Sequence, residues 1–82
     1  MWRIEYRKEV RNYIYDSYPY TETIWQTIKA LRHTPDGLPP ANYITLAPNI
    51  FQWSVASHLV VYRRHWDQNK LDFLIIKPLD NE

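Results

Sequence analysis

Hydrophobic and charged side chains alternate at the start of the chain. Trp2, Ile4 and Tyr6 are separated by Arg3 and Glu5, which is the period-two pattern of a strand with one buried face. We therefore expect the three apolar side chains to point inward and the two charged ones outward.

After this strand the apolar residues take helical spacing. A short helix is predicted over residues 7–16, and Pro19 turns the chain after it. A second helix begins after Thr21, a favourable N-cap residue, and ends before Pro35. Its apolar stripe follows the i, i+1, i+4, i+7 spacing and consists of Ile24, Trp25, Ile28 and Leu31.

The second half of the chain has the pattern of a sheet. A proline-rich connector leads into strand-like runs, and Ala56-Ser57 is expected to form a tight hairpin between two of them. The last run is almost continuously apolar, so we expect a strand that is covered on both faces. The predicted strands span residues 43–46, 50–55, 58–64 and 71–77.

These elements predict an α+β fold with the order β-α-α-β-β-β-β. Two N-terminal helices would pack on one face of a mostly antiparallel sheet, and the other face would be partly open. The predicted core residues are Ile24, Ile28, Leu31, Phe73 and Ile75. Of the tryptophans, Trp25, Trp53 and Trp66 are expected in the core or at its edge.

Composition narrows the class of protein. The 82 residues fit a single domain over residues 1–82, with an acidic tail at residues 79–82 that we expect to be loose. Cysteine is absent and Gly37 is the only glycine, which excludes thiolate metal sites, disulfides and glycine-rich nucleotide loops. The three histidines lack zinc-site spacing, so no metal or cofactor is expected. Without an apolar run of about 20 residues or a signal-peptide pattern, the sequence indicates a cytoplasmic protein with no membrane contact.

The formal net charge is only +1, but the basic residues cluster in two places. One cluster lies in the first eleven residues, where Lys8 and Arg11 are candidates for contact with a protein partner. The other is the run Arg63-Arg64-His65. Such patches suit a small polyanionic site or an acidic partner peptide, and ordinary solvated faces explain them as well.

The run HLVVYRR at residues 58–64, preceded by FQWSV at residues 51–55, resembles the RelE/ParE superfamily of type II toxins. The strand-helix-helix start adds to the resemblance, which covers residues 2–77. It implies a small antitoxin protein as partner. It also implies one of two targets: messenger RNA on the ribosome, which RelE-like members cut, or DNA gyrase, which ParE-like members inhibit without hydrolysis.

The basic residues that the resemblance implies for RNA cleavage match only in part. Lys77 matches the basic residue that ends the last strand, whereas Leu59 stands where an arginine opens the preceding strand. Trp53 or Ser54 replaces the basic residue of the hairpin strand, and the terminal aromatic or histidine falls beyond Pro78. Either the catalytic charges have moved to the Arg63-Arg64-His65 run, or the protein is not a ribonuclease.

Candidate site residues follow from this comparison. The catalytic candidates are His58, Arg64 and Lys77, and the candidates for binding an anion or nucleic acid are Tyr62, Arg63, Arg64, His65 and Lys77. Because His58, Tyr62 and Arg64 share one face of their strand, we place that polar face outward. Since Arg64 and Lys77 end strands, their replacement by alanine is expected to leave stability unchanged.

The resemblance therefore implies a toxin or toxin-like protein, and we expect it to inhibit its target by binding, through the open sheet face and the basic N-terminal helix. The alternative is a noncatalytic interaction domain that keeps the fold without toxicity. Under either hypothesis, the surplus of aromatic residues in the chain implies an exposed apolar patch, where an antitoxin helix or a second copy in a homodimer would dock.

Overall fold

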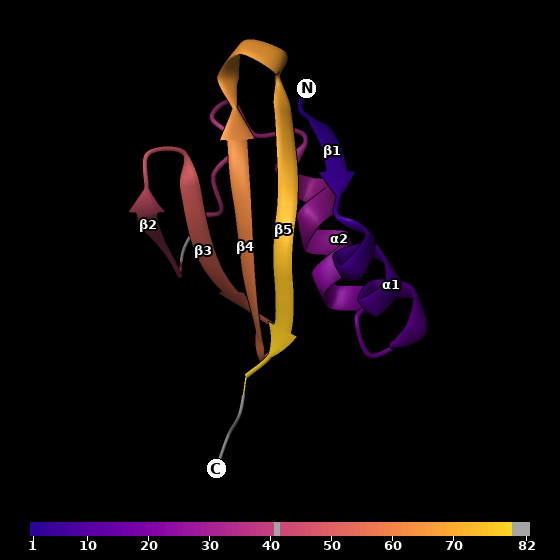
Figure 1. The fold of residues 1–82 in the computed structure, drawn as a ribbon. Helices are drawn as coiled ribbons and strands as arrows, with labels where there is room; N and C mark the ends of the chain where they lie inside the picture. Colours follow the sequence, from indigo (N-terminus) through magenta and orange to yellow (C-terminus); the bar gives the residue numbers. More distant parts are fainter. Residues whose placement is uncertain (41, 80–82) are drawn as a thin grey trace.

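The computed structural model describes residues 1–40 and 42–79 (Figure 1). The predicted order of elements and the α+β class are confirmed. In chain order the elements are β1 (Arg3–Tyr6), α1 (Lys8–Asp16), α2 (Glu22–Leu31), β2 (Tyr43–Ala47), β3 (Ile50–Val55), β4 (His58–His65), the short 3-10 helix η1 (Trp66–Gln68) and β5 (Lys70–Pro78).

The strands form one five-stranded sheet with the order β1-β5-β4-β3-β2. The pairs β2–β3, β3–β4 and β4–β5 are antiparallel, and β1 pairs with β5 in parallel. The first and last strands of the chain are therefore neighbours, while β1 and β2 form the two edges of the sheet (Figure 1).

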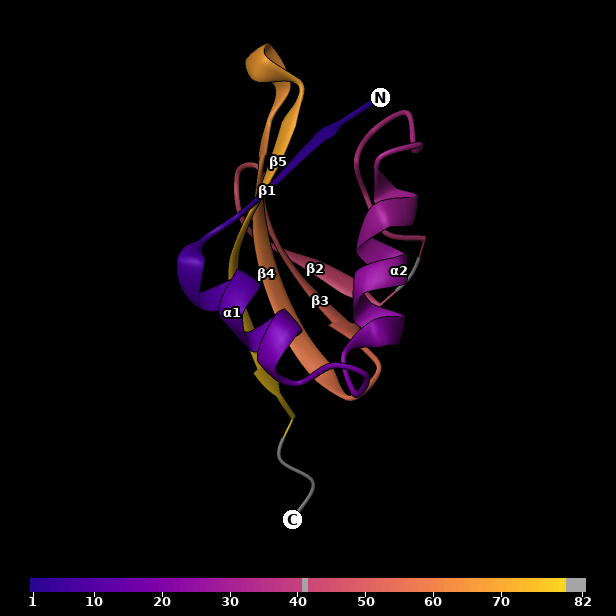
Figure 2. The same ribbon diagram turned by 90° about the vertical axis from the view of Figure 1, so that its right-hand side faces the viewer.

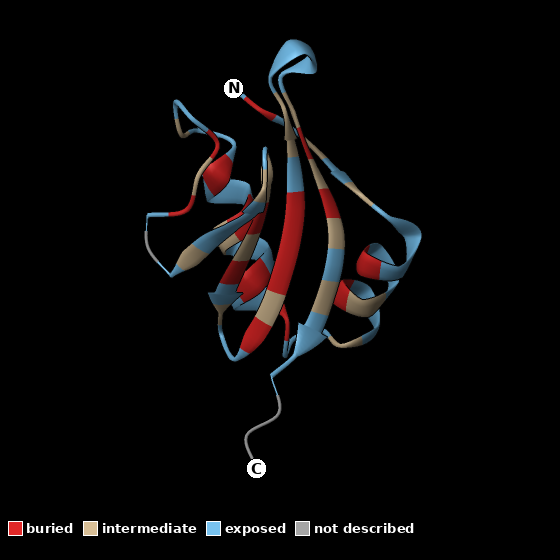
Figure 3. Ribbon diagram, turned by 60° about the vertical axis from the view of Figure 1, so that its left-hand side comes forward, coloured by how far each residue is buried: buried red, intermediate tan, exposed pale blue. Residues whose placement is uncertain are grey.

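Both helices contribute to one core on one side of the sheet (Figure 2). Three of the four residues of the predicted stripe of α2 are buried, namely Ile24, Ile28 and Leu31, whereas the fourth, Trp25, is 38% exposed. From α1, Val10 and Ile14 enter the same core, to which β4 contributes the buried residues Val60 and Tyr62 (Figure 3). Trp53 is in the core, whereas Trp25 and Trp66 are partly exposed.

The prediction that Ile75 belongs to the core is wrong. Its side chain is 48% exposed, because the register of β5 shifts within the strand. Phe73 pairs with Tyr62 and Ile75 pairs with Val61, which leaves Leu74 as an extra residue on β5. This bulge interrupts the alternation, so Phe73 faces the helices and Ile75 faces the open side. The strand is therefore not covered on both faces.

Thr21 was expected to cap α2, but its side chain joins the two helices instead. Thr21 makes no side-chain cap on α2. It is buried, and its hydroxyl donates to the carbonyl of Ile14 at 2.7 Å, which joins α2 to α1.

The hairpin between β3 and β4 turns on Ala56 and Ser57 as predicted, with φ of 50° and 60°. Of the predicted loose tail, Leu79 donates its N–H to the carbonyl of Ser57 at 2.8 Å, and residues 80–82 lie outside the described residues.

The connector between α2 and β2 is fixed to the sheet at Gly37. This residue has φ of +68°, and a Cβ there would lie 3.0 Å from the ring of Trp2. The hydroxyl of Tyr62 donates to the carbonyl of Gly37 at 2.8 Å, and the guanidinium of Arg64 donates to the carbonyl of Asp36 at 2.7 Å. Two side chains of β4 thus hold down a segment that has no regular structure of its own.

Candidate functional site

His58 lies in the core, not on the open face. It is fully buried, and both ring nitrogens have partners. Nδ1 lies 2.8 Å from the carbonyl of Ala56, and Nε2 lies 2.8 Å from the hydroxyl of Tyr13. Since a carbonyl can only accept, Nδ1 carries the hydrogen, and Nε2 can accept from the tyrosine. The outward placement of His58 is wrong, and this imidazole tethers α1 to β4.

Tyr62 is also fully buried, which corrects its outward placement. Its ring stacks on Phe73 with centroids 4.9 Å apart. Burial raises the pKa of the Tyr62 phenol, and the nearby Arg64 guanidinium only partly opposes this rise. The hydroxyl therefore stays protonated and serves as the donor to Gly37.

Arg64 shares the inner face with Tyr62, and its guanidinium is held by several groups. The Arg64 Cζ lies 4.9 Å from the ring centroid of Phe51 and 4.5 Å from that of Trp66. Besides its bond to Asp36, the side chain donates from Nε to Oδ1 of Asn49 at 3.1 Å. The sheet therefore separates Arg64 from the other basic candidates, and its contacts lead us to expect that its loss lowers stability, contrary to the sequence-based expectation.

Arg63, His65 and Lys77 lie on the open face. The register pairs Lys77 with Leu59, Arg63 with Asp72, and His65 with Lys70. Between the two ends, one row runs across four strands through Ile44, Gln52, Val61 and Ile75. Its exposed apolar side chains are Ile44 and Ile75, whereas Val61 is buried.

The spacing along β4 determines whether the three basic side chains of the open face can contact the same anion. Arg63 lies four residues beyond the partner of Lys77, which is roughly 13 Å at the rise of a strand. His65 lies two residues further, or about 20 Å from Lys77. His65 and Lys77 are too far apart to meet on one phosphate, but all three residues can contact an extended polyanion at separate points.

Acidic residues partly balance the Arg63 end of the open face. Glu5 pairs with Asp72 in the sheet, beside Arg63. In residues 1–40 and 42–79, the two ion pairs both use Glu5, which lies 3.4 Å from Arg3 and 3.3 Å from Lys70. The stronger attraction for an anion is therefore expected at the Lys77 end.

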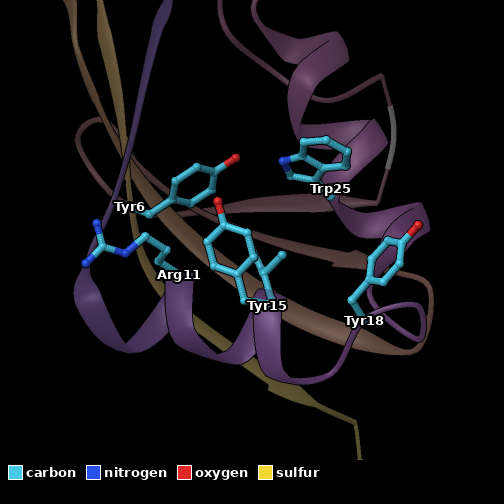
Figure 4. Close-up of a pocket in the computed structure, with 6 residues that line it drawn as sticks. Tyr6, Arg11, Tyr15, Tyr18 and Trp25 are labelled. Atoms are coloured by element: carbon cyan, nitrogen blue, oxygen red, sulfur yellow. The ribbon is translucent and has the colours of Figure 1, made fainter.

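A second exposed surface lies between α1 and α2 (Figure 4). We call it the aromatic groove; it has a volume of about 460 Å³ and is lined by Tyr6, Arg11, Ile14, Tyr15, Tyr18 and Trp25. Its aromatic rings come from β1, from both helices and from the turn between them. Tyr15 is 73% and Tyr18 59% exposed, so these rings add little to the core.

Cations surround the aromatic groove. Arg11 lines it, and the Nζ of Lys29 lies 4.3 Å from the ring centroid of Trp25. Burial raises the pKa of the Tyr6 phenol, the neighbouring Tyr15 raises it further, and Arg32 opposes the rise. An apolar groove with this rim suits an apolar segment that carries acidic residues.

Comparison with known proteins gives one structural likeness. No protein-family model and no curated protein sequence matches the chain. The crystal structure of the isolated RelE toxin from E. coli superposes with a TM-score of 0.81. The superposition covers 100% of this chain and 88% of the toxin, at 8% sequence identity. The chain has a RelE-like fold.

This RelE-like fold brings together only part of the predicted site. Arg63, His65 and Lys77 share the open face, whereas His58, Tyr62 and Arg64 belong to the opposite side. Of the two partner candidates, Arg11 lines the aromatic groove and Lys8 does not.

The aromatic surplus of the sequence predicted an exposed apolar patch, but it did not say where the patch lies or which residues line it. The exposed rings of Tyr15 and Tyr18 and the partly exposed ring of Trp25 identify the aromatic groove as one such patch. Among the residues that the structure describes, no three histidine or carboxylate side chains gather at metal-binding distance. No helix in the same part of the chain is long and apolar enough to cross a membrane.

Proposed function

We propose that this RelE-like chain is a cytoplasmic toxin-like component of a type II toxin–antitoxin system. It inhibits translation or DNA gyrase by binding, and the open sheet face contacts the target. The observation that carries the proposal is the likeness to a toxin over the whole chain, combined with an open face that exposes the apolar side chains of Ile44 and Ile75 and is basic at Lys77 and Arg63.

Binding is favoured over RNA cleavage by the geometry of the open face. Cleavage needs a base for the 2′-hydroxyl and a cation for the phosphate at the same bond. Of the three catalytic candidates only Lys77 lies on this face, because Arg64 is on the inner face and His58 is buried with both ring nitrogens in use. The apolar side chains of Ile44 and Ile75 on the open face supply contact area instead of acid–base groups.

Induced expression in a bacterial host tests this proposal. We expect growth to stop with the wild-type chain and to continue with the double variant Arg63→Glu, Lys77→Glu. Losing one charge-assisted contact typically costs about 1.5–3 kcal/mol, or one to two decades of affinity. Protein synthesis and plasmid supercoiling are measured after induction, because they distinguish a block of translation from a block of gyrase.

A control with the same change of charge is the double variant Arg7→Glu, Lys8→Glu, at the exposed start of α1 on the other side of the sheet. It should arrest growth as the wild type does. If the Arg63→Glu, Lys77→Glu variant arrests growth as strongly as the control, the open face is not the inhibitory surface. If the folded wild-type chain has no effect on growth, translation or supercoiling, the toxin proposal is wrong.

The partner of such a toxin is an antitoxin, and we place its docking site in the aromatic groove. Tyrosine, tryptophan and arginine are the residues most enriched among those that dominate binding energy at interfaces, and all three line this groove. The basic rim favours an amphipathic segment with acidic residues beside its apolar side chains.

Arg11→Glu is expected to weaken this docking by tenfold or more, because it places a negative charge against an acidic partner. Lys8→Glu is the matched control, since Lys8 is exposed on α1 outside the groove. The affinity for the product of a neighbouring short reading frame is measured by calorimetry. Equal losses for both variants would mean that the helix acts through its overall charge, and no loss for Arg11→Glu would exclude the groove.

The second candidate function is an interaction domain without toxicity. Two exposed apolar side chains of the open face favour this second function. Ile44 and Ile75 are about half exposed, and they suit contact with a protein surface better than contact with a nucleic acid. In that case induction leaves growth unchanged, while the aromatic groove still binds its partner.

A further inference from the structure

The two edges of the sheet differ in how they are protected. Exposed strand edges pair readily with other strands, and proteins commonly block them with short length or with charges. The β1 edge has both protections, since it is four residues long and carries Arg3 and Glu5. The β2 edge has no charged residue, and its Ile44 and Leu46 are 55% and 50% exposed.

The lack of charge extends well beyond β2. No aspartate, glutamate, lysine or arginine occurs in residues 37–57, which include the whole β2–β3 hairpin at the edge of the sheet (Figure 1). A charged partner would find no countercharge here, whereas a second copy of the same hairpin would meet no repulsion. The charge pattern therefore favours self-association over binding of an acidic or basic segment.

The register of β2 shows how a second copy would fit. The N–H of Ser54 donates to the carbonyl of Asn42, and Ile44 pairs with Gln52 two residues further on. Hydrogen bonds between antiparallel strands use alternate residues, so the main-chain groups of Tyr43 and Thr45 face away from β3. Pairing extends little beyond Thr45, because the register shifts before Ala47.

We propose that two copies of this chain pair through β2 in an antiparallel dimer, with the twofold axis at Ile44. Tyr43 of each copy then exchanges main-chain hydrogen bonds with Thr45 of the other. The two Ile44 side chains meet directly on the open face, where opposed Cβ atoms are about 4.5–5.5 Å apart. Such an interface is isologous and closes after two copies, so the two sheets become one.

Opposite charges at position 44 test the dimer. Ile44→Glu and Ile44→Lys each place two like charges against each other at the axis. We therefore expect the dimer of either variant alone to have a dissociation constant at least tenfold higher than that of the wild type. An equimolar mixture should recover the dimer, because glutamate then faces lysine. Sedimentation equilibrium of the purified full chain measures all three samples and the wild type.

Ile75→Glu is the matched control, since Ile75 is a similarly exposed isoleucine in the same row of the open face but on a central strand. It should dimerise as the wild type does. Thermal unfolding verifies that each variant is folded. A wild-type chain that remains monomeric at its highest soluble concentration overturns the proposal. So does a mixture of the two charged variants that gains nothing, which would assign the β2 edge to a strand of another protein or to solvent.

Discussion

Arg64→Ala is expected to lower the free energy of unfolding by about 2–3 kcal/mol, or Tm by roughly 10–20 °C. Hydrogen bonds of a charged group are typically worth about 1.5–3 kcal/mol, and each cation–π contact adds about 0.5–1 kcal/mol. Arg64 donates to Asp36 and Asn49 and lies against the rings of Phe51 and Trp66. Urea unfolding monitored by tryptophan fluorescence measures the loss.

The neighbouring arginine provides the control. Arg63 is exposed on the opposite face of the same strand, so Arg63→Ala should change the free energy of unfolding by less than about 0.5 kcal/mol. Similar losses for the two variants would show that Arg64 contributes only its charge, and that its contacts with the connector have no structural role.

Tyr62→Phe is expected to lower the free energy of unfolding by about 1–3 kcal/mol near neutral pH, because the carbonyl of Gly37 loses its buried donor. The difference between the variant and the wild type should shrink at high pH. Burial raises the pKa of Tyr62 in the folded state above the ordinary tyrosine value of about 10.

The direction of this pH dependence follows from the number of protons that the folded and unfolded chains bind. Above pH 10 the unfolded chain loses the Tyr62 proton while the folded chain keeps it, so this tyrosine's contribution is full below pH 10 and is lost as the pH rises toward the folded-state pKa. The wild-type stability should fall more steeply than that of Tyr62→Phe, by up to about 1.4 kcal/mol per pH unit.

Urea unfolding at steps between neutral pH and pH 11 measures both slopes. Tyr18→Phe is the control, because its ring is largely exposed, and it should follow the wild-type curve. Parallel curves for the wild type and Tyr62→Phe would mean that Tyr62 is not held in a buried, protonated state.

The sequence was sufficient to predict the helices and strands and their order, because each element has its own spacing of apolar residues. The stripe of α2 and the alternation at Trp2, Ile4 and Tyr6 survive in the structure. The bulge at Leu74 could not be predicted, since an extra residue in a continuous apolar run leaves the pattern unchanged. Ile75 was therefore assigned to the wrong face.

The candidate site was less predictable than the fold. Polar residues were taken to mark the solvent face of β4, but His58 and Tyr62 are buried because Tyr13, Ala56 and Gly37 provide partners for their polar atoms. Tyr13 and Gly37 are far away in the sequence and give no local signal there. Burial of a polar side chain depends on such distant partners, and periodicity does not report them.

The parallel pairing of β1 with β5 sets the order in which the protein can be completed. Arg3 lies beside Lys70 and Tyr6 beside Phe73, so the first strand to be synthesised has no partner until the last strand exists. A chain that stops before β5 would leave β1 unpaired and α1 without the strand it packs against. It would also lack Lys77 and the hydrogen-bonded neighbour of β4. A chain truncated before β5 therefore has only part of the open face, and this surface is finished only once β5 has been synthesised.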